Sequence, residues 1–153
     1  MTRTIILVED QADVAHMLQE VLESEGYDVR VFYRSEGVVE QITELRPDAV
    51  LIDLLLPGTS GIALAQDLRR QGHTGPLIAM SASRPMMHLA RRCGLFIDTL
   101  DKPFELGALF GTLHRRVEQD TEGHGRWMHA QPLEIPPLGQ RVRVDGAPRV
   151  IEG

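Results

Sequence analysis

Charged and hydroxyl residues directly follow the short apolar runs in this sequence. Glu9 and Asp10 follow the first run, Asp53 closes the third, Ser81 follows the fourth and Lys102 stands behind the fifth. Three carboxylates beside one ammonium carry excess negative charge, and like charges ~4–6 Å apart either raise a pKa or recruit a cation. Mg²⁺ prefers carboxylate oxygens together with water and substrate phosphate. A carboxylate beside Mg²⁺, with a lysine and a hydroxyl facing the incoming oxygens, would accept a phosphoryl group. Asp53 is the central acid, so we predict that it is the nucleophile.

Each of these residues is weak evidence when it is taken alone. An aspartate after a strand, such as Asp10, commonly caps a helix or forms a turn. Lys102 precedes a proline and would lie in a surface loop of most proteins, and Ser81 by itself indicates nothing. Their occurrence together at the ends of four strands makes the combination specific.

The elements that must position these residues follow from the hydrophobic pattern. Short apolar runs alternate with segments of helical period, which is typical of an α/β fold. Strands are predicted at residues 4–8, 27–33, 49–53, 77–80 and 96–100. Helices are predicted over residues 14–26, 36–45, 62–71, 85–93 and 106–117, with the core face of the first formed by Val14, Met17, Leu18, Val21 and Leu22. Residues 57–61 are expected to form a loop.

Five such units build a five-stranded parallel sheet that is doubly wound, flavodoxin-like, with strand order 2-1-3-4-5. In sheets of this kind the chemistry lies outside the carboxyl ends of the strands, near the point where the strand order reverses. The residues behind the four strands should therefore meet at one edge.

Composition limits the classes of partner. The formal net charge of −6 argues against a general attraction to nucleic acid. The single cysteine, Cys93, allows no internal disulfide and is expected to be a small buried side chain. The first apolar run is far too short for a signal segment or a membrane span, so we expect a cytoplasmic protein without a membrane partner.

Four stretches resemble the receiver domains of two-component response regulators, the CheY-like superfamily. They are residues 7–10, residues 51–61 from Leu51 to Gly61, residues 78–82 and residues 101–104. The resemblance covers roughly residues 3–118, which we expect to form the receiver domain.

The resemblance implies a role for each acidic position. Asp53 would accept a phosphoryl group from the phosphohistidine of a sensor histidine kinase or phosphotransfer protein. Asp10, Asp53 and the backbone carbonyl of Leu55 would ligate Mg²⁺, and Glu9 would act mainly through metal-bound water. The chain would thereby catalyse its own phosphorylation and dephosphorylation, without a separate output enzyme domain, and alter its contacts with a downstream protein.

The resemblance also implies roles for the remaining polar positions. Lys102 would pair with one phosphoryl oxygen, and Ser81 would hydrogen-bond another and move with its loop. The bond between Lys102 and Pro103 is expected to be cis. The family's switch aromatic usually lies three residues before the lysine, where this chain has Thr99, and Phe96 is an alternative for that role in a shifted register.

Residues 119–153 change in character and are rich in proline and glycine. Residues 141–151 alternate around Asp145 and Gly146, which predicts a short hairpin, and no DNA-binding domain fits there. His124 and His129 flank Trp127 and could bind a metal, but a polar linker with one anchoring aromatic is the simpler interpretation. We expect this tail to contact a partner or a second copy of the chain.

Other functions fit these residues less well. A flavodoxin would need small polar residues for the flavin phosphate, where Glu9 and Asp10 would repel an anion. An aspartate-nucleophile phosphatase would need an acid at Leu55. The main alternative is a protein-interaction module of receiver fold that signals without phosphorylation.

Overall fold

The chain folds around one five-stranded parallel sheet. In the computed structural model, which describes residues 2–118, 142–144 and 147–149, the strand order is β2-β1-β3-β6-β7. These strands are β1 (Thr4–Val8), β2 (Asp28–Phe32), β3 (Ala49–Asp53), β6 (Leu77–Ser81) and β7 (Asp98–Asp101). The predicted flavodoxin-like architecture is confirmed, since the intervening β4 and β5 belong to a separate small hairpin.

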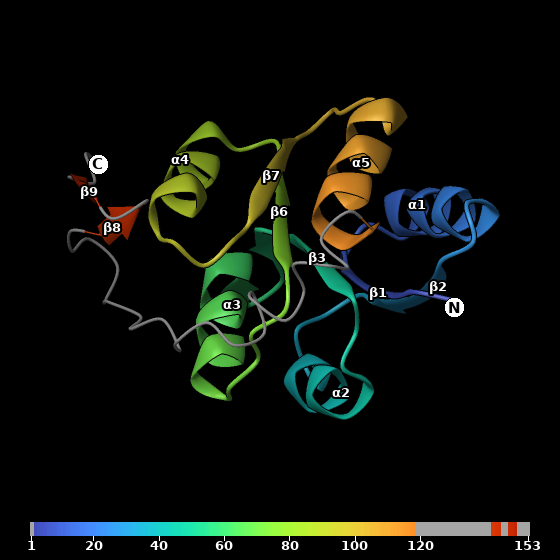
Figure 1. Ribbon diagram of the computed structural model, residues 1–153, viewed down its shortest axis with the longest axis horizontal. Helices are drawn as coiled ribbons and strands as arrows, with labels where there is room; N and C mark the ends of the chain where they lie inside the picture. The colour runs from blue at the N-terminus through green and yellow to red at the C-terminus, as the bar shows by residue number, and fades with distance from the viewer. Residues whose placement is uncertain (1, 119–141, 145–146, 150–153) are drawn as a thin grey trace.

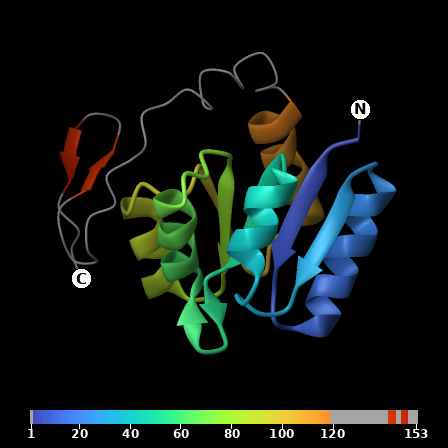
Figure 2. The same ribbon diagram turned by 90° about the horizontal axis from the view of Figure 1, so that it is seen from below.

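Helices cover both faces of this sheet, as Figures 1 and 2 show. The described helices are α1 (Ala12–Ser24), α2 (Val38–Leu45), α3 (Gly61–Arg70), α4 (Arg84–Arg92) and α5 (Leu106–Leu113), which continues as the π-helical turn η1 (His114–Glu118). Side chains of α2, α3 and α4 share one buried cluster, and those of α1 and α5 share another. Successive side chains of β1 point to opposite faces of the sheet, so Ile6 and Val8 lie in the first cluster, while Ile5 and Leu7 lie in the second.

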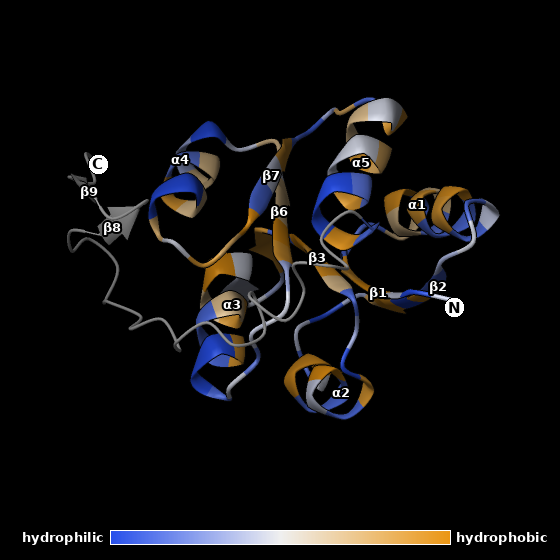
Figure 3. Cartoon of the chain, in the orientation of Figure 1, coloured by the Kyte–Doolittle hydropathy of each residue, from blue (hydrophilic) through white to orange (hydrophobic). Residues whose placement is uncertain are grey.

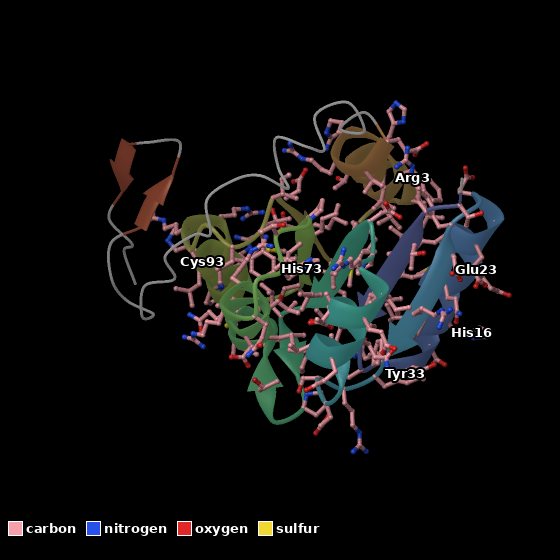
Figure 4. The ribbon with its side chains drawn as sticks, turned by 60° about the horizontal axis from the view of Figure 1, so that its bottom comes forward. Arg3, His16, Glu23, Tyr33, His73 and Cys93 are labelled. Atoms are coloured by element: carbon pink, nitrogen blue, oxygen red, sulfur yellow. The ribbon has the colours of Figure 1, made fainter. Side chains whose placement is uncertain are left out.

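The central strands are apolar because both of their faces are covered. All five residues of β3 are buried, and Figure 3 shows the hydrophobic strands in the middle of the molecule with hydrophilic residues on the outer helices. The single cysteine, Cys93, is also buried, and its burial raises the pKa of the thiol to about 11. Figure 4 marks its place beside α4.

Two details of the predicted elements were wrong. Met17 is 44% exposed and points away from the core, because the buried face of α1 is formed by Ala15, Leu18 and Leu22. The fifth strand begins at Asp98 rather than at residue 96. Its polar residues are tolerated because β7 is an edge strand, whereas Phe96 precedes the strand and packs against the cluster shared by α2, α3 and α4.

The segment predicted as a loop after β3 contains a small antiparallel hairpin. Strands β4 (Leu55–Leu56) and β5 (Thr59–Ser60) pair around a turn in which Gly58 has a φ of 75°. This left-handed conformation suits glycine, and it returns the chain directly to α3.

The last described segments also form a hairpin. Strand β8 (Val142–Val144) pairs antiparallel with β9 (Ala147–Arg149). The expectations for His124, Trp127 and His129 concern residues outside those that the structure describes. Within the described ranges, no helix combines the length and apolar character needed to cross a bilayer.

Candidate functional site

The polar residues predicted behind the strands meet at the carboxyl edge of the sheet. Parallel pairing aligns the strand ends, so that Asp53 lies opposite Met80 and Ser81 lies opposite Asp101. The pairing continues past the strands, because the amide of Lys102 donates to the carbonyl of Ser81 at 2.9 Å. The sheet therefore brings Glu9, Asp53, Ser81 and Lys102 to one edge without any unusual loop.

Lys102 links two carboxylates from different strands. Its Nζ donates to Oε1 of Glu9 and, at 3.0 Å, to Oδ2 of Asp53. The Glu9 side chain is 0% exposed and the Lys102 side chain is 18% exposed, so this contact is largely removed from water. Lys102 is also the only lysine in the chain.

Burial controls the protonation of this group. Burial raises the pKa of Glu9 to about 7, a hydrogen bond with Asp53 acts in the same direction, and Lys102 opposes the rise. Burial alone would lower the pKa of Lys102, but its hydrogen bonds to Glu9 and Asp53 outweigh that effect and leave the pKa raised. Lys102 therefore remains an ammonium at neutral pH.

Asp53 is held at the site by the backbone amide of Leu55 and by α3. Its Oδ1 accepts a hydrogen bond from the amide of Leu55 at 2.9 Å, which leaves Oδ2 to Lys102. Gly61 begins α3 against the end of β3, and a Cβ added there would lie 2.5 Å from the carbonyl oxygen of Asp53. The close approach requires glycine, and this role was not predicted from the sequence. A glycine directly before a helical pattern was the available signal.

Three carboxylates can converge on one cation at this edge. Glu9, Asp10 and Asp53 each offer an oxygen, and the three oxygens lie within 4.8 Å of one another. With all three carboxylates ionised and the ammonium of Lys102 beside them, the group would carry an excess of two negative charges. Carboxylate oxygens are the ligands that Mg²⁺ prefers, so the residues fit a magnesium ion.

Ser81 closes the site on the side of α4. It is 2% exposed, and its Oγ accepts a hydrogen bond from the amide of Ser83 at 3.0 Å. Ser83 in turn caps α4 by accepting from the amide of Met86. The peptide bond between Lys102 and Pro103 is cis, as predicted.

The position expected for an aromatic switch residue is occupied by Thr99. It lies in β7 opposite Ala79, and its hydroxyl accepts from Nε of Arg91 on α4 at 3.3 Å. Nη2 of the same arginine donates to Oδ2 of Asp101 at 2.6 Å. Sequence reasoning missed Arg91, because its pairing depends on how α4 lies across the edge strand.

Known proteins share this fold over most of its length. The chain is 30% identical over 148 residues to the DNA-binding response regulator MtrA of Mycolicibacterium paratuberculosis, covering 95% of this chain and 65% of that protein. A CheY-like receiver domain from Methylobacillus flagellatus is 29% identical, with a TM-score of 0.68 over 75% of this chain and 98% of the other. The BeF3-activated N-terminal receiver domain of Klebsiella pneumoniae RstA is 28% identical, with a TM-score of 0.68 over 76% and 99% of the two chains.

The comparison with MtrA leaves one expectation open. The chain spans about two thirds of the length of MtrA, which is named as a DNA-binding protein. The expected absence of a nucleic-acid partner therefore stays a prediction. The family assignment rests on a separate match, in which the model of the response regulator receiver domain covers residues 5–114. The chain belongs to the receiver domains of two-component response regulators.

Proposed function

We propose that this protein is a phosphorylation-dependent switch in which Asp53 accepts the phosphoryl group. The observation that carries the proposal is the contact of Lys102 with the buried carboxylates of Glu9 and Asp53 at the sheet edge. An acceptor must be a carboxylate with a free face and a nearby cation, and Asp53 has Lys102 at 3.0 Å.

The transfer is a displacement at phosphorus. A carboxylate oxygen of Asp53 forms a bond to the phosphorus, and the bond from phosphorus to the imidazole nitrogen of a phosphohistidine breaks. The nitrogen keeps the electron pair, and the imidazole leaves after it has taken a proton from solvent. The product is an acyl phosphate on Asp53, and Lys102 and Ser81 would bind two of its oxygens.

The acidic residues would hold Mg²⁺ beside this group. We assign direct ligation to Asp10, Asp53 and the backbone carbonyl of Leu55, and a role through metal-bound water to Glu9. A bound Mg²⁺ would offset the charge that develops on the transferring phosphoryl group. The convergence of three carboxylate oxygens supports this assignment.

The phosphoryl donor would be a sensor histidine kinase or a phosphotransfer protein, and the output would be a change in contacts with a downstream protein. The likeness to the receiver domain of RstA, which is named as BeF3-activated, supports activation of this chain by a phosphoryl-like group. A phosphorylation-independent interaction module is the alternative, and the two differ in whether Asp53 is labelled.

Treatment with acetyl phosphate and Mg²⁺ tests the proposal. We expect one phosphoryl group per chain, stable in acid and labile in alkali, and we expect Asp53→Asn to abolish it. Asp67→Asn is the matched control, because Asp67 is an exposed aspartate on α3 that pairs with the neighbouring Arg70. Equal labelling of Asp53→Asn would show that the nucleophile is another residue, and an unlabelled wild type with normal partner binding would favour the interaction module.

A further inference from the structure

Helix α4 is attached to the proposed phosphoacceptor site at two points. At its N-terminus, the amide of Ser83 donates to the hydroxyl of Ser81 at 3.0 Å. In its last turn, Arg91 reaches over the edge strand β7 and contacts Thr99 and Asp101. Both attachments end on residues that adjoin the site, since Asp101 precedes Lys102 and lies opposite Ser81 in the sheet.

The contacts of Arg91 form a clasp between α4 and β7. Its Nη2 lies 2.6 Å from Oδ2 of Asp101, and its Nε lies 3.3 Å from Oγ1 of Thr99. Thr99 and Asp101 are two residues apart on the strand, so their side chains project on the same face. One planar guanidinium can therefore engage both, which a lysine ammonium could not do with the same geometry.

The clasp is weak, because it lies at the surface. The side chains of Arg91 and Asp101 are 50% and 64% exposed. Exposed ion pairs change an equilibrium by only about two- to fivefold. An interaction of this strength contributes little to folding, yet it is large enough to bias a helix between two positions of similar free energy.

A phosphoryl group on Asp53 would act on both attachments. Lys102, which here contacts Glu9 and Asp53, would turn to a phosphoryl oxygen, and so would the hydroxyl of Ser81. Lys102 and Asp101 share one peptide bond, so a backbone shift at Lys102 would move Asp101, which carries the shorter contact of the clasp. The site and the clasp are thus linked through a single strand end.

We propose that Arg91 is a positioning residue that couples α4 to the phosphoacceptor site through Asp101 and Thr99. The inference rests on the proposed function, since it concerns the response of α4 to an anion at Asp53. The clasp favours the arrangement in which Lys102 contacts the carboxylates, so an anion at Asp53 weakens it. Coupling is reciprocal, and loss of the clasp must therefore strengthen anion binding by the same factor.

Beryllofluoride with Mg²⁺, titrated by calorimetry, is the probe, and hydrogen exchange of residues 84–92 reports on α4. We expect Arg91→Ala to bind beryllofluoride about two- to fivefold more tightly than wild type and to exchange faster in α4 without the probe. Arg84→Ala is the matched control, because it removes the same charge from an exposed position of the same helix. The charge-exchanged double variant Arg91→Asp/Asp101→Arg should return both values toward wild type.

The outcomes separate this inference from the proposed function. If Arg91→Ala matches Arg84→Ala in affinity and exchange, or if the double variant gives no recovery, the coupling through Arg91 is overturned while the phosphoacceptor stands. If wild type fails to bind beryllofluoride, the proposed function is overturned and the coupling with it.

Discussion

Lys102 lies between two carboxylates that water can barely reach. The side chain of Glu9 is fully buried, and the nearby Asp53 is 6% exposed, so the ammonium offsets charge that solvent cannot. A lysine supplies a compact point charge, whereas an arginine supplies a broad planar fork. Lys102 is the single lysine of this chain, and the remaining residues of the Lys and Arg types are all arginine. The lysine occurs between the two buried carboxylates, where a compact ammonium is needed.

Lys102 therefore should not be replaceable by arginine. We expect both Lys102→Ala and Lys102→Arg to fold, and both to lose at least about tenfold in the rate of phosphotransfer from acetyl phosphate. The alanine variant lacks the charge and the arginine variant cannot place it. Circular dichroism would establish the fold, and Arg70→Ala on the exposed face of α3 is the control. Full activity of Lys102→Arg would argue that charge alone is required.

The carboxylates should differ in their importance for the metal. We assign Asp10 to direct ligation and Glu9 to a contact through water, and Glu9 is already bonded to Lys102. Asp10→Asn should therefore lower Mg²⁺ affinity more than Glu9→Gln, as measured by titration. Asp13→Asn, an exposed aspartate in the first turn of α1, should leave it unchanged. If Asp10→Asn binds Mg²⁺ as tightly as wild type does, Asp10 is not a metal ligand and the proposed site is wrong.

The hydrophobic pattern predicted most accurately the strands that are covered on both faces. The bounds of β1 and β3 agree with the prediction because their apolar runs are continuous. The edge strand β7 was displaced by two residues, because its polar side chains carry no apolar signal. The convergence of Glu9, Asp53 and Lys102 on one edge followed from the strand order, whereas the contacts of Lys102 with both carboxylates were not predicted. The clasp of Arg91 and the packing of Gly61 depend on helix placement, which the pattern does not contain.

The contact of α3 with β3 can be tested at Gly61. A Cβ there would lie 2.5 Å from the carbonyl oxygen of Asp53 and 2.8 Å from Cα of Leu54. Because these are backbone atoms, we expect Gly61→Ala to lower the free energy of unfolding by about 1–3 kcal/mol and to slow phosphorylation by displacing Asp53. Gly107→Ala in α5 is the control, since a Cβ there meets nothing within 4 Å. That variant should be neutral or stabilised by up to about 1 kcal/mol in urea denaturation.

The loop between α3 and β6 should make the fold sensitive to acid. Burial lowers the pKa of His73 to about 4, and the charge of Arg69 acts in the same direction. Arg69 donates to the backbone carbonyls of His73 and Gly75 at 2.8 and 2.9 Å, which holds the loop backbone at these residues. Figure 4 labels the His73 side chain. Nε2 of His73 is buried and has no hydrogen-bond partner among the described residues.

The direction of this pH dependence follows from proton binding at His73. The unfolded chain binds a proton at His73 below pH 6.5, and the folded chain does so only near pH 4. The stabilisation is complete above pH 6.5 and is lost as pH falls toward 4. As the pH falls from 6.5 to 4, the free energy of unfolding of wild type should drop by about 1–3 kcal/mol more than that of His73→Gln, as measured by denaturant titration. Parallel pH profiles for the two proteins would contradict the assignment.

The core of the described residues is complete by the end of η1. The buried clusters on both faces of the sheet use residues between Ile5 and Val117. The end of η1 is fixed to the edge of the sheet, because the hydroxyl of Tyr27 donates to Oε2 of Glu118 at 2.7 Å. A chain that ends after Glu118 should therefore keep the receiver fold and the site.

The hairpin of β8 and β9 requires a different explanation. Each strand has three residues, and an isolated two-stranded hairpin is marginally stable in water. We therefore expect residues 119–153 to contact a partner or a second copy of the chain, by strand addition among other routes. Deleting residues 119–153 should leave acetyl phosphate labelling of Asp53 intact and should change the molar mass in light scattering or the binding of a partner. Deleting residues 142–153 alone should give the same change if the hairpin makes the contact. If mass and partner binding are unchanged in both deletions, the segment acts as a linker.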